Sequence, residues 1–152
     1  MHAILNQPIK NLAFSTTENP HTSFADFKGK IIVLYFYPKD NTPGCTIEAK
    51  DFRDLYTKFL AADAVILGVS RDSLASHEKF KTDCELPFPL ISDDKEELCH
   101  YFDVIKEKNM YGKKVMGVDR STFLIDREGV LRQEWRNVKV PGHVQEVLCR
   151  VD

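Results

Sequence analysis

The sequence lacks the features that mark several large classes of protein. No apolar run in its 152 residues is long enough to cross a membrane, and the opening MHAILNQPIK has no basic segment followed by an apolar one. Excess charge is also missing, since 21 Lys and Arg face 23 Asp and Glu for a formal net charge of -2. We therefore expect a cytoplasmic protein that binds neither nucleic acid nor a membrane.

Cysteine is scarce and widely spaced. The four cysteines never form a CxxC pair, and they are Cys45, Cys84, Cys99 and Cys149. This spacing fits neither a disulfide-dense secreted scaffold nor a zinc ribbon. In a reducing compartment, the remaining roles for these thiols are packing in the core and redox chemistry.

Patterns that bind metals or phosphates are missing too. His77, His100 and His143 lack the spacing of metal ligands, so solvated or packed imidazoles are the better interpretation. Gly29-Lys30 and Gly112-Lys113 lack the rest of a phosphate-binding loop. We therefore expect no metal and no cofactor.

Repeats and Gly/Ser linkers are absent, so we expect a single domain over residues 1–152. The first half reads as a βαβ unit. The apolar runs IIVLYFY (31–37) and AVILGVS (64–70) are typical of strands buried on both faces. Between them, apolar residues recur at helical spacing over residues 43–62. The crossover between the two strands should be right-handed.

The second half adds elements of both kinds. We predict helices over residues 73–84 and 94–102, and a short closing helix that includes Val144 and Val151. STFLID (121–126) and residues 130–136 should form an antiparallel hairpin around a glycine turn. The predicted fold class is α/β, with a mixed central β-sheet flanked by helices on both faces.

The most informative segment joins the first buried strand to the helix after it. Read as a helix start, Thr42 is the N-cap, and Pro43, Gly44 and Cys45 take the first three helical positions. A capping box would bring the Cys45 sulfur near the Thr42 hydroxyl and the unpaired backbone N–H groups, which favour thiolate over thiol. The alternative is a small residue packed at a good helix start.

These residues resemble a known family. Pro38, Thr42 and Cys45 form P-x-x-x-T-x-x-C, the peroxiredoxin active-site signature, and YFYPKDNTPGCTIEA resembles the bacterioferritin-comigratory, or peroxiredoxin Q, subfamily. The similarity continues through VSRDS, FPLISD and FDVIKEKNMYGKKVMGVDRSTFLID. It implies a thioredoxin-like fold, a monomer, and reduction of hydrogen peroxide and organic hydroperoxides to water and alcohols at the expense of thioredoxin.

The resemblance also implies roles for individual residues. Cys45 is similar to the peroxidatic cysteine, Thr42 to its hydroxyl partner, and Arg120 to an arginine supplied by a later strand. Without the resemblance, Arg120 would read as a solvated charge. Pro38 should shield the thiolate or shape the loop. Glu48 lies one turn beyond Cys45, so we expect Arg120 to neutralise it, unless it is a surface acid.

Acidifying a thiol cannot by itself make a peroxidase. A shift in thiol pKa from about 8.5 to about 6 raises the thiolate fraction at pH 7 about thirtyfold. The accompanying loss of nucleophilicity costs about thirteenfold, which leaves a gain of about twofold. We therefore expect Arg120, Thr42 and the backbone N–H groups of Gly44 and Cys45 to bind the peroxide and stabilise its departing oxygen.

A sulfenic acid on Cys45 needs a second thiol. Many members of the subfamily carry that cysteine five residues later, where this chain has Lys50. Cys84 is the preferred resolving cysteine, with core packing as its alternative; Cys99 is expected to pack, and Cys149 receives no role. A disulfide between Cys45 and Cys84 should unwind residues 42–49.

Three other functions compete with this interpretation. A one-cysteine peroxidase would be recycled directly by an external thiol, and a peroxide sensor would be oxidised once without turnover. A thioredoxin-type disulfide oxidoreductase is disfavoured because Glu48 occupies the place of the second cysteine of CxxC.

Overall fold

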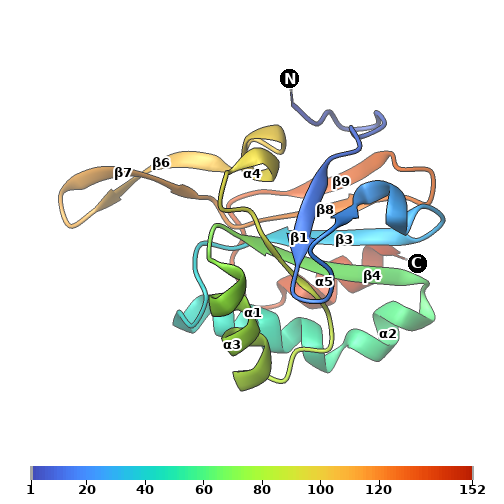
Figure 1. The fold of residues 1–152 in the computed structure, drawn as a ribbon, viewed down its shortest axis with the longest axis horizontal. Helices are drawn as coiled ribbons and strands as arrows, with labels where there is room; N and C mark the ends of the chain where they lie inside the picture. The colour runs from blue at the N-terminus through green and yellow to red at the C-terminus, as the bar shows by residue number, and fades with distance from the viewer. Residues whose placement is uncertain (1, 152) are drawn as a thin grey trace.

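The computed structural model describes residues 2–151, apart from the side chain of Met110. Its centre is a seven-stranded sheet with strand order β2-β1-β5-β4-β3-β8-β9 (Figure 1). The strands are β1 Ala13–Thr16, β2 Thr22–Ser23, β3 Ile31–Phe36, β4 Ala64–Ser70, β5 Leu90–Ser92, β8 Ser121–Ile125 and β9 Leu131–Trp135. β3, β4 and β5 are parallel and the other pairs are antiparallel, so the predicted mixed sheet is confirmed.

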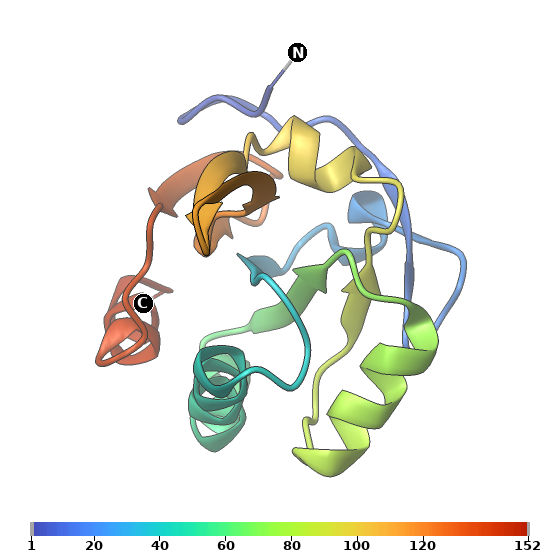
Figure 2. The same cartoon turned by 90° about the vertical axis from the view of Figure 1, so that its left-hand side faces the viewer.

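Helices cover both faces of the sheet, as predicted (Figure 2). The helices are η1 Phe24–Phe27, α1 Pro43–Asp54, α2 Tyr56–Ala61, α3 Leu74–Asp83, α4 Glu97–Tyr101 and α5 His143–Val151. The buried side chains of α1, α2, α3 and α5 form one core with one face of the sheet. Those of α4 and η1 form a second core on the opposite face. Each core is therefore closed by a different set of helices.

The predicted βαβ unit is present. β3 and β4 pair in parallel from Ile31 opposite Ala64 to Phe36 opposite Val69. The helical segment between them breaks at Leu55, whose backbone angles are φ -104° and ψ 8°, so the single helix predicted over residues 43–62 is two helices. Phe52 and Phe59, on either side of the break, both lie in the core, where their ring centroids are 5.8 Å apart.

Residues 105–118 form a hairpin that the sequence did not predict. β6 Ile105–Met110 and β7 Lys113–Val118 pair only with each other and project from the body of the molecule (Figure 1). Tyr111 and Gly112 both have positive φ, as a two-residue hairpin turn requires. Its lysines interrupt the apolar alternation that identifies strands, because both faces of a projecting ribbon meet solvent.

Other predicted elements differ mainly at their ends. The helix predicted over residues 94–102 is the shorter α4, whereas α3 matches its prediction, with Ser73 as N-cap and Cys84 as C-cap. The β8–β9 hairpin turns at Gly129, whose φ is +82°. No helix within residues 2–151 is both long enough and apolar enough to span a bilayer.

Candidate active site

Cys45 lies in the first turn of α1, directly after the buried central strand β3. Thr42 is the N-cap with extended backbone angles, φ -87° and ψ 153°, and Pro43 opens the helix as predicted. The Cys45 side chain is buried, with 1% of its surface exposed. The sulfur is therefore held at the positive end of a 12-residue helix and away from bulk water.

The predicted capping box is not formed. The Thr42 side chain accepts no hydrogen bond from the helix; its hydroxyl instead donates to the carbonyl oxygen of Lys39 over 2.9 Å. That contact closes the loop between β3 and α1, because it joins residues three apart in the chain. A hydroxyl that donates its hydrogen still has lone pairs that can accept one.

Arg120 reaches the sulfur from the other side of the site. Its Nη2 lies 3.4 Å from Cys45 Sγ, and its Nη1 donates to Glu48 Oε1 over 2.6 Å. Only 16% of the Arg120 side chain is exposed, so it is not a solvated charge at the end of a strand. Its carbonyl accepts from the Val138 N–H over 2.9 Å, which fixes the backbone where β8 begins.

Gly44 makes room for this arginine. A Cβ atom at position 44 would lie 3.1 Å from Arg120 Nη2, closer than nearly all real Cβ contacts. The sequence analysis predicted a role for the backbone N–H of Gly44, but no pattern in the sequence indicates this packing constraint. The missing side chain therefore lets the guanidinium lie against the start of α1.

Glu48 is the buried acid of the site. Its side chain is fully buried, and its Oε2 has no hydrogen-bond partner among residues 2–151. Burial raises the pKa of Glu48 to about 7, although the charge of Arg120 and its hydrogen bond oppose that rise. Burial disfavours the charged form of Arg120 as well, but Glu48 and Cys45 together raise its pKa. One guanidinium thus serves both a carboxyl group and a thiol.

Stacked aromatic side chains lie near these charged groups. The ring of Tyr35 stacks on Phe52 and Tyr37, with centroids 4.5 and 5.5 Å away. The pKa of the Tyr35 hydroxyl is raised well above its ordinary value, first by burial and then by Glu48 and Cys45. Tyr35 is therefore close enough for the charges of the site to shift the pKa of its hydroxyl. Its buried ring also keeps the local dielectric constant low. Sequence reasoning placed it only in a buried strand.

The remaining predicted residues occupy different parts of the molecule. Pro38 is half-buried in the loop that follows β3. Cys84 caps α3 and shares the core that contains Cys45, whereas Cys99 lies in the core on the opposite face of the sheet. Cys149 is exposed on α5, and all four cysteines are free thiols.

The two buried candidate thiols differ in their surroundings. Burial raises the pKa of Cys84, and burial together with Asp93 raises that of Cys99 far more. The carbonyl of Cys84 accepts from Arg53 Nη1 over 2.8 Å, which ties the end of α3 to α1. Cys84 is therefore linked to the helix that carries Cys45.

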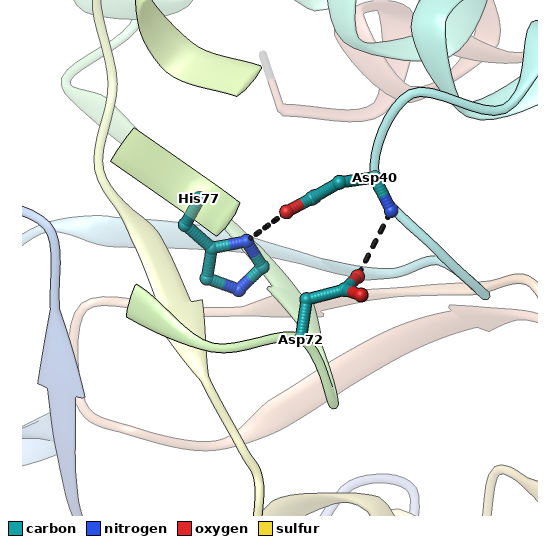
Figure 3. A group of neighbouring side chains, drawn as sticks. All are labelled: Asp40, Asp72 and His77. Atoms are coloured by element: carbon teal, nitrogen blue, oxygen red, sulfur yellow. Dashed lines mark hydrogen bonds and ion pairs between the residues drawn. The ribbon is translucent and has the colours of Figure 1, made fainter. Parts of the chain in front are cut away.

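A second polar cluster lies beside the Cys45 loop and was not predicted. Asp40, Asp72 and His77 place oxygen and nitrogen atoms within 4.8 Å of one another (Figure 3). His77 Nδ1 is 2.8 Å from Asp40 Oδ2, and the Asp40 N–H donates to Asp72 Oδ2 over 2.9 Å. The predicted reading of His77 as a packed or solvated imidazole is right about its packing, since the ring is completely buried.

The fold and the site together define a thioredoxin-fold thiol protein whose buried helix-start cysteine faces an arginine. Comparison with known proteins gives the family: the AhpC/TSA family model matches residues 5–134, and the chain belongs to that family. It is 53% identical to peroxiredoxin Bcp of Bacillus subtilis over 144 residues, which cover 95% of this chain and 92% of that protein.

Solved structures agree with this assignment. Peroxiredoxin Q of Xanthomonas campestris superposes with a TM-score of 0.90 at 50% identity, covering 98% of this chain and 96% of that one. A cysteine-to-serine mutant of PrxQ from Xylella fastidiosa gives a TM-score of 0.93 at 42% identity, covering 99% and 96%. The expected fold is thus confirmed, and the chain is a peroxiredoxin, an enzyme that reduces peroxides with thiol electrons.

Proposed function

We propose that this peroxiredoxin reduces hydrogen peroxide and organic hydroperoxides through a sulfenic acid on Cys45, that Cys84 resolves it as an intramolecular disulfide, and that thioredoxin reduces the disulfide. The observation that carries the proposal is the 3.4 Å contact between Arg120 Nη2 and the buried Cys45 sulfur. The bacterioferritin comigratory protein of X. campestris, a relative of known structure, is described as having alkyl peroxide reduction activity, which supports the organic substrates.

In the peroxide step, the Cys45 thiolate attacks one oxygen of ROOH. The O–O bond breaks, the sulfur becomes S–OH, and the departing RO⁻ takes a proton to leave as alcohol or water. Arg120 and the N–H groups of Gly44 and Cys45, which lie in the unpaired first turn of α1, can stabilise the charge on the departing oxygen. The free lone pairs on the Thr42 oxygen can accept the peroxide hydrogen and orient it.

Burial makes these donors effective. The sulfur and Glu48 lie among aromatic side chains with almost no solvent exposure, so charge–dipole interactions are stronger there than in water. Pro38 is half-buried in the loop between β3 and α1, and we assign it the shielding role predicted from the sequence. Since acidifying the thiol gains only about twofold in rate, we assign most of the catalysis to stabilisation of the leaving oxygen.

In the resolving step, the Cys84 thiol attacks the Cys45 sulfenic acid. An S–S bond forms, the S–O bond breaks, and the hydroxide leaves with the thiol proton as water. Cys84 shares the core of Cys45, whereas the sheet separates Cys99 from it and Cys149 faces solvent. Both sulfurs are buried at helix ends, so the first turn of α1 and the end of α3 must open before the bond forms.

A one-cysteine peroxidase is the second candidate function. The observation that favours it is the burial of the Cys84 thiol, which raises its pKa and so lowers its thiolate fraction. An external thiol would then reduce the sulfenic acid directly.

Steady-state peroxide consumption with thioredoxin and its reductase tests the proposal. Cys45→Ser should abolish turnover, and Arg120→Ala should lower kcat/KM for peroxide by about 10²- to 10³-fold, as expected for loss of a charge-stabilising donor. Cys84→Ser should stop turnover with thioredoxin after one oxidation, while the exposed Cys149→Ser serves as the matched control.

The outcomes separate the two candidates. Full turnover by Cys84→Ser with thioredoxin would establish the one-cysteine mechanism, and normal turnover by Cys45→Ser would overturn the proposed function altogether. Peptide mapping without reductant, after one equivalent of peroxide, should find a Cys45–Cys84 disulfide in the wild type. A linkage to Cys99 or Cys149 would contradict the assignment of Cys84.

Two properties of the whole protein belong to the same proposal. We propose a cytoplasmic location, because the cycle consumes thiol electrons that a reducing compartment supplies. We also propose a monomer, as the family resemblance implies; the exposed large apolar side chains within residues 2–151 are few and are distributed over the N-terminal segment, α1, α2 and the β6–β7 hairpin. Light scattering on the reduced protein would test the second point; a stable dimer would contradict it.

A further inference from the structure

The catalytic cycle above does not use the buried polar cluster of Asp40, Asp72 and His77. His77 lies on α3 with no exposed surface, and its Nε2 is 2.9 Å from the carbonyl oxygen of Ile91. A carbonyl oxygen can only accept a hydrogen bond, so Nε2 carries a hydrogen. The ring has a second nitrogen that can form a hydrogen bond.

That nitrogen, Nδ1, lies 2.8 Å from Asp40 Oδ2. The Asp40 carboxyl also accepts from the Tyr37 hydroxyl over 2.6 Å and from the Ser76 hydroxyl over 2.8 Å. Burial disfavours the ionised form of Asp40, but the hydrogen bonds from His77, Tyr37 and Ser76 hold its pKa below the ordinary value. Asp40 and His77 therefore form a hydrogen-bonded pair that is buried on both sides.

Asp72 links the pair to the carboxyl ends of β4 and β5 through hydrogen bonds. The Asp40 N–H donates to Asp72 Oδ2, and the Ser70 hydroxyl at the end of β4 donates to the same oxygen over 2.6 Å (Figure 3). The Asp72 carbonyl accepts from the Ser92 hydroxyl at the end of β5 over 2.7 Å. The loop before Cys45 is thus attached to α3 and to the sheet at one point.

This point lies close in sequence to both cysteines. Asp40 is five residues before Cys45, and His77 is seven residues before Cys84. The path from one sulfur to the other is therefore 12 residues through the Asp40–His77 pair. Without that pair, the path through the bond between Asp40 and Asp72 is 17 residues. Five extended residues reach about 17 Å, whereas seven helical residues span only about 10 Å. Both sulfurs can therefore move and meet while the pair stays intact.

We propose that Asp40 and His77 are positioning residues for the disulfide step. Their hydrogen bond holds the start of the Cys45 loop on α3, so that unwinding after peroxide attack is confined to residues beyond Asp40 in one segment and beyond His77 in the other. The inference rests on the proposed roles of Cys45 and Cys84. The probability of chain closure falls with the 3/2 power of path length, so lengthening the path from 12 to 17 residues should slow disulfide formation by about 1.7-fold.

A matched pair of variants tests the hydrogen bond between Asp40 and His77. In His77→Gln the side-chain amide can take the place of Nε2 and keep the bond to Ile91, but it loses Asp40. In His77→Asn the amide takes the place of Nδ1 and keeps Asp40, but it loses Ile91. Reduced protein is mixed with one equivalent of hydrogen peroxide and quenched at intervals, and mass spectrometry counts Cys45 sulfenic acid and the Cys45–Cys84 disulfide.

We expect disulfide formation to slow by about 1.7-fold in His77→Gln, as the longer path predicts, and to stay near the wild-type rate in His77→Asn. Peroxide consumption in the first turnover serves as the internal reference for a folded active site. With excess peroxide, His77→Gln should also accumulate more Cys45 sulfinic acid, because its sulfenic acid waits longer for the second thiol. Equal slowing in both variants, or in neither, would overturn the proposal.

A second pair covers the case in which the His77 variants do not fold. In Asp40→Asn the side-chain amide can still form hydrogen bonds with Tyr37 and His77, whereas Asp40→Ala removes the hydrogen bond to His77. Slow disulfide formation in Asp40→Ala alone supports the proposal, and equal rates contradict it. Failure of the proposed function would appear earlier, in the wild type: no sulfenic acid would refute the role of Cys45, and a different disulfide would refute both Cys84 and the positioning role.

Discussion

At the scale of single residues, the site depends on one arginine shared between two groups that can each become anionic. Arg120 uses separate nitrogen atoms for Cys45 and Glu48, which the planar guanidinium allows and a lysine ammonium would not. Glu48 orients Arg120, but it also competes with the sulfur for the same positive charge. The protonation of Glu48 should therefore influence how readily the thiolate forms.

Glu48→Gln tests this competition. Burial raises the pKa of Glu48 to about 7, above its ordinary value, so the wild-type carboxyl loses its proton as pH rises through that region and then opposes a second anion at the sulfur. With the neutral amide, Arg120 faces Cys45 alone, and thiolate formation should move to lower pH. The pH dependence of the rate of Cys45 alkylation measures this shift in thiolate formation. The exposed Glu78→Gln is the control, and an unchanged profile in Glu48→Gln would contradict the competition.

The reactive residues could be predicted from the sequence, but most of the residues that surround and position them could not. Cys45, Thr42, Arg120 and Glu48 follow from the helix start and the family signature, and the structure places Arg120 against both Cys45 and Glu48. Tyr35 and the Asp40–His77 pair carry no local pattern, because their contacts join segments far apart in the chain. The predicted capping box at Thr42 is not formed, and its hydroxyl donates to the carbonyl of Lys39 in a local contact that the helix-start pattern does not specify.

At the scale of elements, the first turn of α1 has to be ordered for the peroxide step and open for the disulfide step. Gly44 affects both requirements. It avoids a contact with Arg120 in the folded turn, and it weakens the helix relative to alanine by about 1 kcal/mol, which favours opening.

Gly44→Ala should therefore slow both steps. Its Cβ would push Arg120 Nη2 away from 3.1 Å, which lowers the rate of peroxide reduction, and the stronger helix would delay opening and disulfide formation. Rapid-mixing measurements of each step would check this. Thr46→Ala strengthens the same helix with no new contact to Arg120, so it should slow only the second step. A normal peroxide rate in Gly44→Ala would contradict the steric role of this position.

Element prediction succeeded where burial and periodicity agreed. β3 and β4 are long, apolar and central, and the sequence located both within a residue. β5 has only three residues and follows a proline-rich stretch, and the β6–β7 hairpin exposes both faces, so neither presents a regular pattern. The break at Leu55 keeps Phe52 and Phe59 in the same core, so the apolar spacing matches that of one continuous helix and did not reveal the break.

At the scale of the whole molecule, the sheet separates chemistry from support. The peroxidatic cysteine, its proposed partner Cys84 and the helices that carry them share the core on one face. The core on the other face contains Cys99 and α4, and none of its side chains belongs to the proposed cycle. Opening on the first face can therefore occur while the second core and the central strands stay packed.

Hydrogen exchange on the reduced and oxidised protein should show this separation. Oxidation by one equivalent of peroxide should increase exchange over residues 42–49 and near Cys84, because those turns must open to form the disulfide. Amides of β3 and β4 and of α4 should keep their protection, since they pack in cores that the disulfide does not disturb. Cys45→Ser treated with the same peroxide is the control and should not change. Faster exchange throughout α4 would mean that the sheet transmits the opening and that the two faces are not independent.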